Sequence, residues 1–182
     1  PASLFMAITR SLFRTLSQHV LSPAKIVTEM NNSISDNNES NMFVTLIVGI
    51  LDLETGILKL CNAGHNPPIL IYPDGQVSYL EFKTQIFVGV VEDFKYSDEE
   101  VVLEKESKLF LYTDGVTEAE NINKELYGEE KLLEMLSDNA SSDVRTTVNV
   151  VVDSIASHVK EAEASDDLTI LLIQYEPGTA NS

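Results

Sequence analysis

Cysteine and basic residues are scarce in this sequence. Cys61 is the single cysteine among 182 residues, which excludes an internal disulfide and a cysteine-based zinc cluster. It lies in a run of alternating apolar and polar residues, so we expect a buried, unreactive thiol. Lysine and arginine number 12 against 29 aspartates and glutamates, giving a formal charge of −17. Because the basic residues are scattered, we expect no nucleic-acid or membrane partner, whereas a cation site is compatible with this charge.

Long apolar runs are also missing. The longest run, residues 42–51, is about half the length of a membrane-spanning helix and contains Thr45 and Gly49. No basic-then-apolar leader is visible, so we expect a cytoplasmic protein. The chain starts at Pro1, directly before a helical pattern, and we therefore expect it to be a piece of a longer chain.

The length and the hydrophobic content of 43% are compatible with one domain that has a substantial core. Apolar residues at every fourth position predict a first amphipathic helix; they are Leu4, Ile8, Leu12, Leu16 and Val20. Ser22 followed by Pro23 predicts the start of a second helix. The two helices together predict an antiparallel pair, followed by a polar loop over residues 35–41.

A series of short strands is expected next. Residues 43–53 are too apolar for a half-exposed strand and predict a central strand covered on both faces. Turn signals at residues 54–56 and 73–75 predict two hairpins. Further strands are expected at 86–91 and 100–103. Short strands joined by tight turns predict an antiparallel meander.

The last third of the chain predicts a strand at 108–112, helices at 128–136 and 144–159, and a final strand at 168–174. The order of elements is a helix pair, a meander of strands, a second helix pair and a strand. This order indicates an α+β fold with helices on the outer faces of the sheet.

Two acidic sites stand out because of their places next to strands. Asp114 follows a strand in the turn Thr113-Asp114-Gly115, and Asp166 and Asp167 precede the last strand. If these strands are antiparallel neighbours, the carboxylates converge at one rim of the sheet. Clustered carboxylates suit Mg²⁺ or Mn²⁺, and two such ions can activate water for attack on a phosphoryl group. On spacing alone, ordinary turn and capping roles remain the stronger alternative.

Five sequence blocks resemble the SpoIIE/RsbU branch of the metal-dependent, PPM-type serine/threonine protein phosphatases. In chain order they are FVTL (43–46), LDLETG (51–56), NAGHNPP (62–68), LYTDGVTE (111–118) and SDDLT (165–169). The resemblance covers nearly the whole chain. It implies an antiparallel β-sandwich flanked by helix pairs, in four α-β-β-α layers, over residues 1–176, with residues 177–182 as a disordered tail.

The resemblance also implies an activity and partners. These are hydrolysis of phosphoserine or phosphothreonine on a bacterial regulatory protein, such as an anti-sigma-factor antagonist, by metal-activated water at a binuclear Mn²⁺ or Mg²⁺ site. An N-terminal sensor or receiver domain in the native chain and a homodimer through the first two helices are further expectations.

Carried over residue by residue, the resemblance makes Asp114 and Asp166 metal ligands, with Asp167 as the alternative to Asp166. It assigns Gly115 a positive φ. His65 is open to three interpretations, namely metal ligand, general acid and turn residue, of which we favour the turn residue.

The sequence departs from the family pattern upstream of Pro1. The pattern expects a strand with an aspartate ligand and an Asp-x-x-Gly-x-Gly turn there, and neither is present. Asp36 and Asp52 are expected in a loop and a hairpin, where they cannot replace these ligands. We therefore expect weak metal binding and weak hydrolysis from this chain alone. A catalytically impaired docking module is the alternative, and a metal phosphodiesterase for small molecules is a weaker one.

Overall fold

The computed structural model describes residues 2–36, 38, 41–160, 162 and 166–177. Within them lie four helices and seven strands in two antiparallel sheets, which confirms the α+β class. Pro177 is the last described residue, so the rest of the expected tail lies outside the described residues. No described helix is long and apolar enough to span a bilayer.

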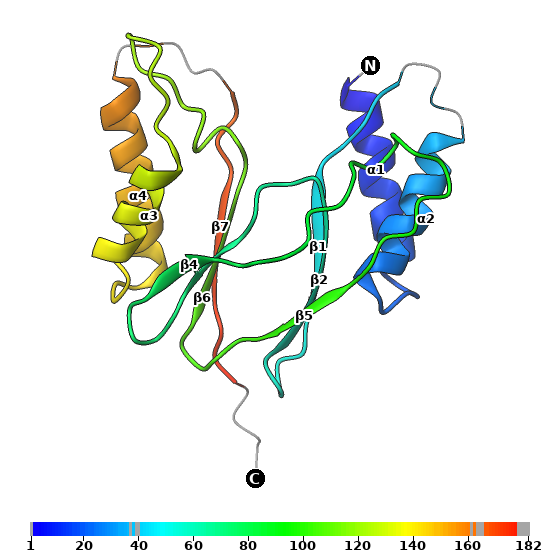
Figure 1. Cartoon of the computed structure of the whole chain (residues 1–182), viewed down its shortest axis with the longest axis horizontal. Helices are drawn as coiled ribbons and strands as arrows, with labels where there is room; N and C mark the ends of the chain where they lie inside the picture. The colour runs from blue at the N-terminus through cyan, green and yellow to red at the C-terminus, as the bar shows by residue number, and fades with distance from the viewer. Residues whose placement is uncertain (1, 37, 39–40, 161, 163–165, 178–182) are drawn as a thin grey trace. The chain divides into compact units, whose positions relative to one another are not determined.

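The chain forms two compact units, each made of two separate stretches. The first unit combines Pro1–His65 with Phe82–Val102, and the second combines Asn66–Glu81 with Leu103–Ser182. Each unit contains one helix pair and one sheet, which Figure 1 shows.

The first unit carries a three-stranded sheet in the order β1-β2-β5, covered by two helices. Its elements are α1 (Ala2–Leu16), α2 (Pro23–Ser35), β1 (Leu46–Leu51), β2 (Ile57–Ala63) and β5 (Glu99–Val102). The predicted hairpin between β1 and β2 is confirmed. Helix α2 buries its apolar face against these two strands because its apolar residues recur at helical spacing.

The start of α2 is as the sequence predicts. The Ser22 hydroxyl accepts a hydrogen bond from the Lys25 N–H, and Pro23 occupies the first turn. Asp98 reinforces the cap, because its carboxylate accepts hydrogen bonds from the Ser22 hydroxyl at 2.7 Å and from the Ala24 N–H. The helix end is thus tied to the segment that leads into β5.

The prediction of a central, doubly covered strand at 43–53 is wrong. Strand β1 is shorter and lies at the edge of the described sheet, and most of its residues are half-buried. The central strand is β2, because β5 pairs with its other edge. An apolar composition indicates that a strand is buried against other elements, but it does not determine whether the strand is central or at the edge of the sheet.

The strand predicted at 86–91 is also wrong, because within the described residues this segment makes one isolated bridge, between Val88 and Val44. The backbone groups of Gly89 pair with side chains instead. The Gly89 N–H donates to Asn31 Oδ1 at 2.9 Å, and the Gly89 carbonyl accepts from Asn38 Nδ2 at 3.0 Å. Gly89 has φ +94°, which interrupts an extended backbone.

The second unit carries a four-stranded sheet in the order β4-β3-β6-β7. Its elements are β3 (Ile69–Ile71), β4 (Val77–Tyr79), β6 (Lys108–Tyr112), α3 (Glu129–Asp138), α4 (Val144–Val159) and β7 (Ile170–Gln174). The β3–β4 hairpin is confirmed. The prediction of a simple antiparallel meander is wrong, because β5 pairs with β2 and β6 pairs with β3. Phe110 and Tyr112 pack with Leu132, Leu136 and Val151 in the core beneath α3 and α4.

Candidate functional site

The pairing of β6 with β7 places the two acidic segments side by side. The strands are antiparallel neighbours, with Tyr112 opposite Ile170, so the arrangement that the sequence analysis considered is present. Beyond this pair the Thr113 N–H donates to the Thr169 carbonyl at 3.1 Å, and Thr113 Oγ1 accepts from the Thr169 N–H at 3.2 Å. Thr113 Oγ1 also donates to the Asp167 carbonyl at 3.3 Å. The turn that carries Asp114 is thereby fastened to the acidic pair.

Gly115 allows this close approach. A Cβ atom at Gly115 would lie 2.5 Å from the Asp167 carbonyl oxygen, which no side chain could tolerate without a shift of backbone. The expectation of a positive φ at Gly115 is wrong, since its φ lies outside the left-handed region. Glycine is required here by the neighbouring strand segment and not by the conformation of the turn.

The aspartates of this rim are exposed. The hydrogen bonds of the Asp114 and Asp166 carboxylates come from the backbone of the next residue in the chain. Asp114 Oδ1 accepts from the Gly115 N–H at 3.0 Å, while the Asp114 carbonyl accepts from the Glu118 N–H at 2.8 Å. Asp166 Oδ1 accepts from the Asp167 N–H at 2.7 Å. Each of these carboxylates thus has oxygen lone pairs that face solvent.

The donor chemistry fits a hard cation in part. The rim offers carboxylate oxygens alone, which suit Mg²⁺ or Mn²⁺ better than zinc. Among the described residues, however, no group of three histidine, cysteine, aspartate or glutamate side chains could hold a metal ion. Asp114 and the acidic pair therefore supply fewer ligands than a complete site.

The two other aspartates considered from the sequence have local roles. Asp52 accepts hydrogen bonds from the Thr55 and Glu54 N–H groups in the β1–β2 turn, and these bonds lower the pKa of its carboxyl. Asp36 occupies the C-cap position of α2. Both lie in the first unit, whereas the β6–β7 rim belongs to the second.

His65 lies in a turn that its neighbours hold in place. Asn62 clamps the turn, because its Oδ1 accepts from the His65 N–H at 2.8 Å and its Nδ2 donates to the His65 carbonyl at 2.9 Å. The ring Nδ1 lies 3.2 Å from Thr45 Oγ1. Gly64 precedes it at φ +76°, with the Phe87 ring where a Cβ would stand. These contacts support the turn interpretation.

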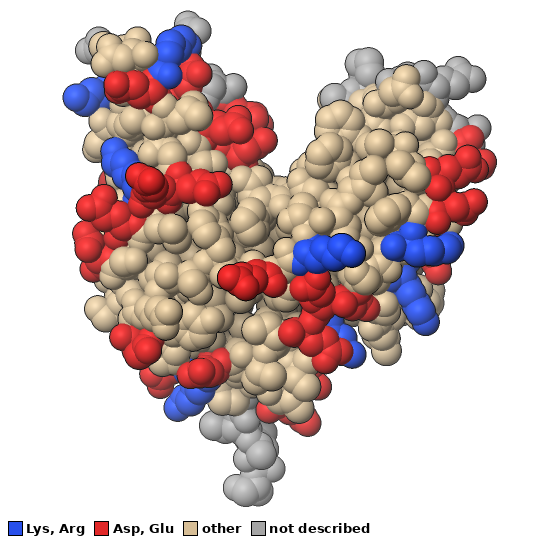
Figure 2. Space-filling view, in the orientation of Figure 1, with Lys and Arg blue, Asp and Glu red and all other residues tan. Residues whose placement is uncertain are grey.

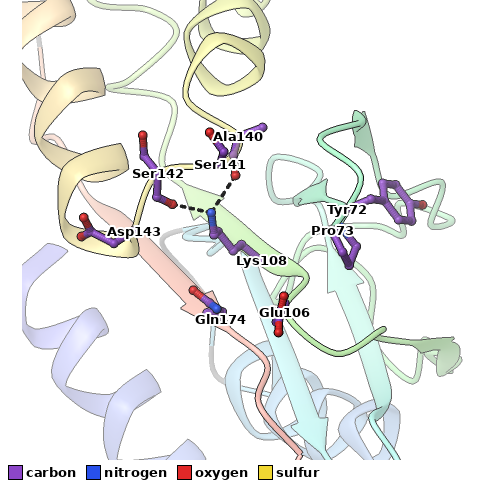
Figure 3. Close-up of a pocket in the computed structure, with 9 residues that line it drawn as sticks. All are labelled: Tyr72, Pro73, Glu106, Lys108, Ala140, Ser141, Ser142, Asp143 and Gln174. Carbon is purple, nitrogen blue, oxygen red and sulfur yellow. Dashed lines mark hydrogen bonds between the residues drawn. The ribbon is translucent and has the colours of Figure 1, made fainter.

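The structure also shows a buried lysine that the sequence did not single out. Lys108 lines a cavity of about 400 Å³, and its Nζ donates hydrogen bonds to the carbonyls of Ala140 and Ser142 (Figure 3). Burial lowers the pKa of this ammonium group. The cavity also contains Glu106 and Asp143, so it is poorly suited to an anion. Lys108 therefore fastens β6 to the α3–α4 connection.

Comparison with known protein families shows to which family this chain belongs. The family model described as Stage II sporulation protein E (SpoIIE) matches residues 1–176. The chain belongs to the SpoIIE family. This confirms the resemblance to the SpoIIE/RsbU branch, and it explains why the blocks around Asp114 and Asp166 occur in one chain.

Two curated relatives in Bacillus subtilis are similar over most of this SpoIIE-family chain. Phosphoserine phosphatase RsbU is 23% identical over 96% of this chain and 51% of its own length. Phosphoserine phosphatase RsbP is 27% identical over 93% of this chain and 42% of its own length. The chain thus spans about half, or less, of the curated relatives it matches.

Solved structures show the same fold. The SiaA-PP2C domain of Pseudomonas aeruginosa has a TM-score of 0.84 at 20% identity, over 97% of this chain and 71% of that one. The phosphatase domain of SpoIIE from Bacillus subtilis, presoaked with Mn, has a TM-score of 0.64 at 15% identity, over 94% and 74%. This SpoIIE-family chain therefore has a PP2C-like phosphatase fold, as expected from its sequence.

Proposed function

We propose that this chain is the phosphatase domain of a metal-dependent protein serine/threonine phosphatase. The observation that carries the proposal is the fastening of the Asp114 turn to the Asp166–Asp167 segment through Thr113. Membership of a family with named phosphoserine phosphatases among its relatives supports the same activity.

The proposed metal is Mn²⁺ or Mg²⁺, as a pair of ions in the intact site. Asp114 and Asp166 would hold it, with Asp167 as the alternative to Asp166. When bound, the metal supplies charge stabilisation for phosphoryl oxygens and a more acidic water. The chain's own contribution is rigidity: Thr113 bridges the two ligand segments, and Gly115 lets their backbones approach.

For the substrate we propose a phosphoserine or phosphothreonine on a bacterial regulatory protein such as an anti-sigma-factor antagonist. The phosphoserine part is supported by the relatives RsbU and RsbP, which are named phosphoserine phosphatases. We place the protein in the cytoplasm, with a sensor or receiver domain preceding this one in the native chain.

We further propose a homodimer through the first two helices. Met6, Ile8 and Phe13 expose large apolar surfaces on α1. An apolar hollow of about 210 Å³ beside them is lined by residues of α1, α2 and β1. Sedimentation velocity of the parent chain and a Phe13→Asp variant tests this contact. We expect a dimer that the substitution disrupts, and a monomeric parent at high concentration would contradict it.

The activity is tested by hydrolysis of a phosphoserine peptide with Mn²⁺ or Mg²⁺, using this chain and a chain extended upstream. We expect weak turnover from this chain, stronger turnover from the extended one, and loss of about 10²-fold or more in Asp114→Asn and Asp166→Asn, since each removes transition-state charge stabilisation. Asp153→Asn, on the exposed face of α4, is the matched control and should leave the rate unchanged. Equal turnover of the two chains would refute the proposal that this chain alone has too few metal ligands.

The second candidate is a docking module with impaired catalysis. It is favoured by the lack of a three-ligand group among the described residues. Binding of a phosphoprotein without turnover, in both chain lengths and at saturating Mn²⁺, would support this module and contradict the enzyme.

A further inference from the structure

Two phenylalanine rings in the first unit are stacked on each other and face solvent. Phe43 lies before β1, and Phe87 lies in the segment between β4 and β5. Their ring centroids are 5.3 Å apart at an interplanar angle of 26°, and the two residues are 57% and 40% exposed. Single exposed apolar residues are common, whereas aromatic residues that are exposed together are typical of interaction surfaces. We call Phe43 and Phe87 the aromatic platform.

The backbone around the aromatic platform holds it in place. Val44 and Val88, the next residues in the two segments, form an antiparallel bridge in which each N–H donates to the other's carbonyl, at 3.1 and 3.0 Å. Gly64 makes room for the Phe87 ring, since a Cβ atom at Gly64 would overlap it. The rings are thus exposed in a fixed arrangement, so a partner would bind them at little cost in ordering.

Two carboxylates follow the platform in the chain. The chain turns at residues 89–93 and then comes back, because the Tyr96 hydroxyl donates to the Phe87 carbonyl at 3.3 Å. Glu92 and Asp93 lie in this turn, and both are exposed. Neither forms an ion pair with another residue that the structure describes. The segment therefore offers negative charge a few residues after an exposed aromatic ring.

We propose that the aromatic platform and the turn with Glu92 and Asp93 form a docking surface for an arginine-containing segment of a partner protein. The planar guanidinium of arginine stacks on aromatic faces and pairs with carboxylates, so arginine is complementary to both parts of this surface. The charge of −17 attracts such a segment and disfavours an acidic one. Docking at this surface does not depend on the proposed phosphatase activity.

Fluorescence anisotropy with a labelled peptide tests the surface. The probe is a flexible Gly-Ser peptide that carries two Leu-Arg pairs, and a matched peptide carries lysine in place of arginine. We expect this chain to bind the arginine peptide about 3- to 10-fold more tightly, because the lysine ammonium cannot stack as a planar group. Equal affinity for the two peptides, or no binding of the arginine peptide, would overturn the proposal.

Substitutions on the platform locate the binding. Phe43→Leu and Phe87→Leu keep an apolar side chain but remove the aromatic face, so each should weaken binding of the arginine peptide about 3- to 10-fold and reduce its advantage over the lysine peptide. Ile122→Ala, at an exposed apolar residue of the second unit, is the control and should leave both affinities unchanged. Unchanged binding of the arginine peptide in both phenylalanine variants would overturn the proposal.

A change of charge tests the carboxylates. Glu92→Gln should weaken binding of both peptides about 2- to 5-fold, because each loses an exposed ion pair. Asp153→Asn changes the net charge of the chain by the same amount at an exposed position of α4, and it should have no such effect. Equal weakening in the two variants would show attraction to the whole chain and would refute this docking surface.

Discussion

At the residue scale, the identity of Gly115 depends on a contact between two segments that are far apart in the sequence. The Asp167 carbonyl occupies the space that a side chain on Gly115 would need. The Thr-Asp-Gly pattern alone indicates a turn, and turns commonly place glycine at positive φ. Only the neighbouring strand segment explains why glycine is needed at a residue whose φ is ordinary.

Replacing Gly115 with alanine should separate the Asp114 turn from the acidic pair. We expect Mn²⁺ affinity of the upstream-extended chain, measured by calorimetry, to fall about 10- to 100-fold, as for other residues that orient metal ligands. Gly128→Ala is the control, because Gly128 has φ +82° but no atom near its Cβ position. It should cost stability without changing Mn²⁺ affinity, and equal losses in both variants would contradict the contact.

Cys61 gives a second prediction at this scale. It is fully buried, and burial raises the pKa of its thiol from 9.0 to about 12. The native thiol should therefore stay protonated and resist a disulfide reagent at about pH 8, whereas the denatured chain should react. Above pH 9.0 the unfolded chain loses this proton first, so stability should fall toward pH 12. Rapid labelling of the native protein would refute the burial of Cys61.

At the element scale, the helices follow their sequence signals more closely than the strands do. The predicted helix at 144–159 matches α4, and Asp143 caps it by accepting from the Thr146 N–H. Caps and helical periodicity are local, so the sequence contains them completely. Strand pairing depends on distant partners, and this is why residues 86–91 form bonds with the asparagines of another segment instead of a strand.

The cap of α2 provides the prediction at this scale. Ser22→Ala removes the acceptor for the Lys25 N–H and the donor to Asp98. We expect a loss of about 1 kcal/mol in the free energy of unfolding, measured by urea titration. Ser33→Ala, at an exposed position of the same helix, should change little. If both variants unfold at the same urea concentration, the cap contributes nothing.

At the scale of the whole molecule, the excess of acidic residues is a property of the surface. Figure 2 shows acidic side chains over much of the visible face and fewer basic ones. The ion pairs among the described residues are exposed, such as Lys59–Glu100 at 2.8 Å. Such pairs contribute little to stability. The charge of −17 is the excess that remains after all 12 basic residues are counted against the 29 acidic ones. Self-repulsion should therefore oppose folding at low salt.

Salt should consequently stabilise this chain. We expect Tm to rise when NaCl increases from about 0.01 M to about 0.15 M, because the Debye length shortens from ~30 Å to ~8 Å. Choline chloride should act alike if the cause is screening and not a specific cation. A falling Tm in both salts would show that attractive pairs dominate the electrostatics.

The sequence by itself determined the helices and the cap of α2, the β1–β2 and β3–β4 hairpins, the positions of Asp114 and Asp166 next to strands, and the family. These features depend on residues close together in the chain or on ordered motifs. Only the tertiary structure decided that β1 lies at a sheet edge, that Gly115 receives the Asp167 carbonyl, and that Phe43 and Phe87 stack on each other. Each of these depends on which distant segments pair, and composition leaves several pairings open.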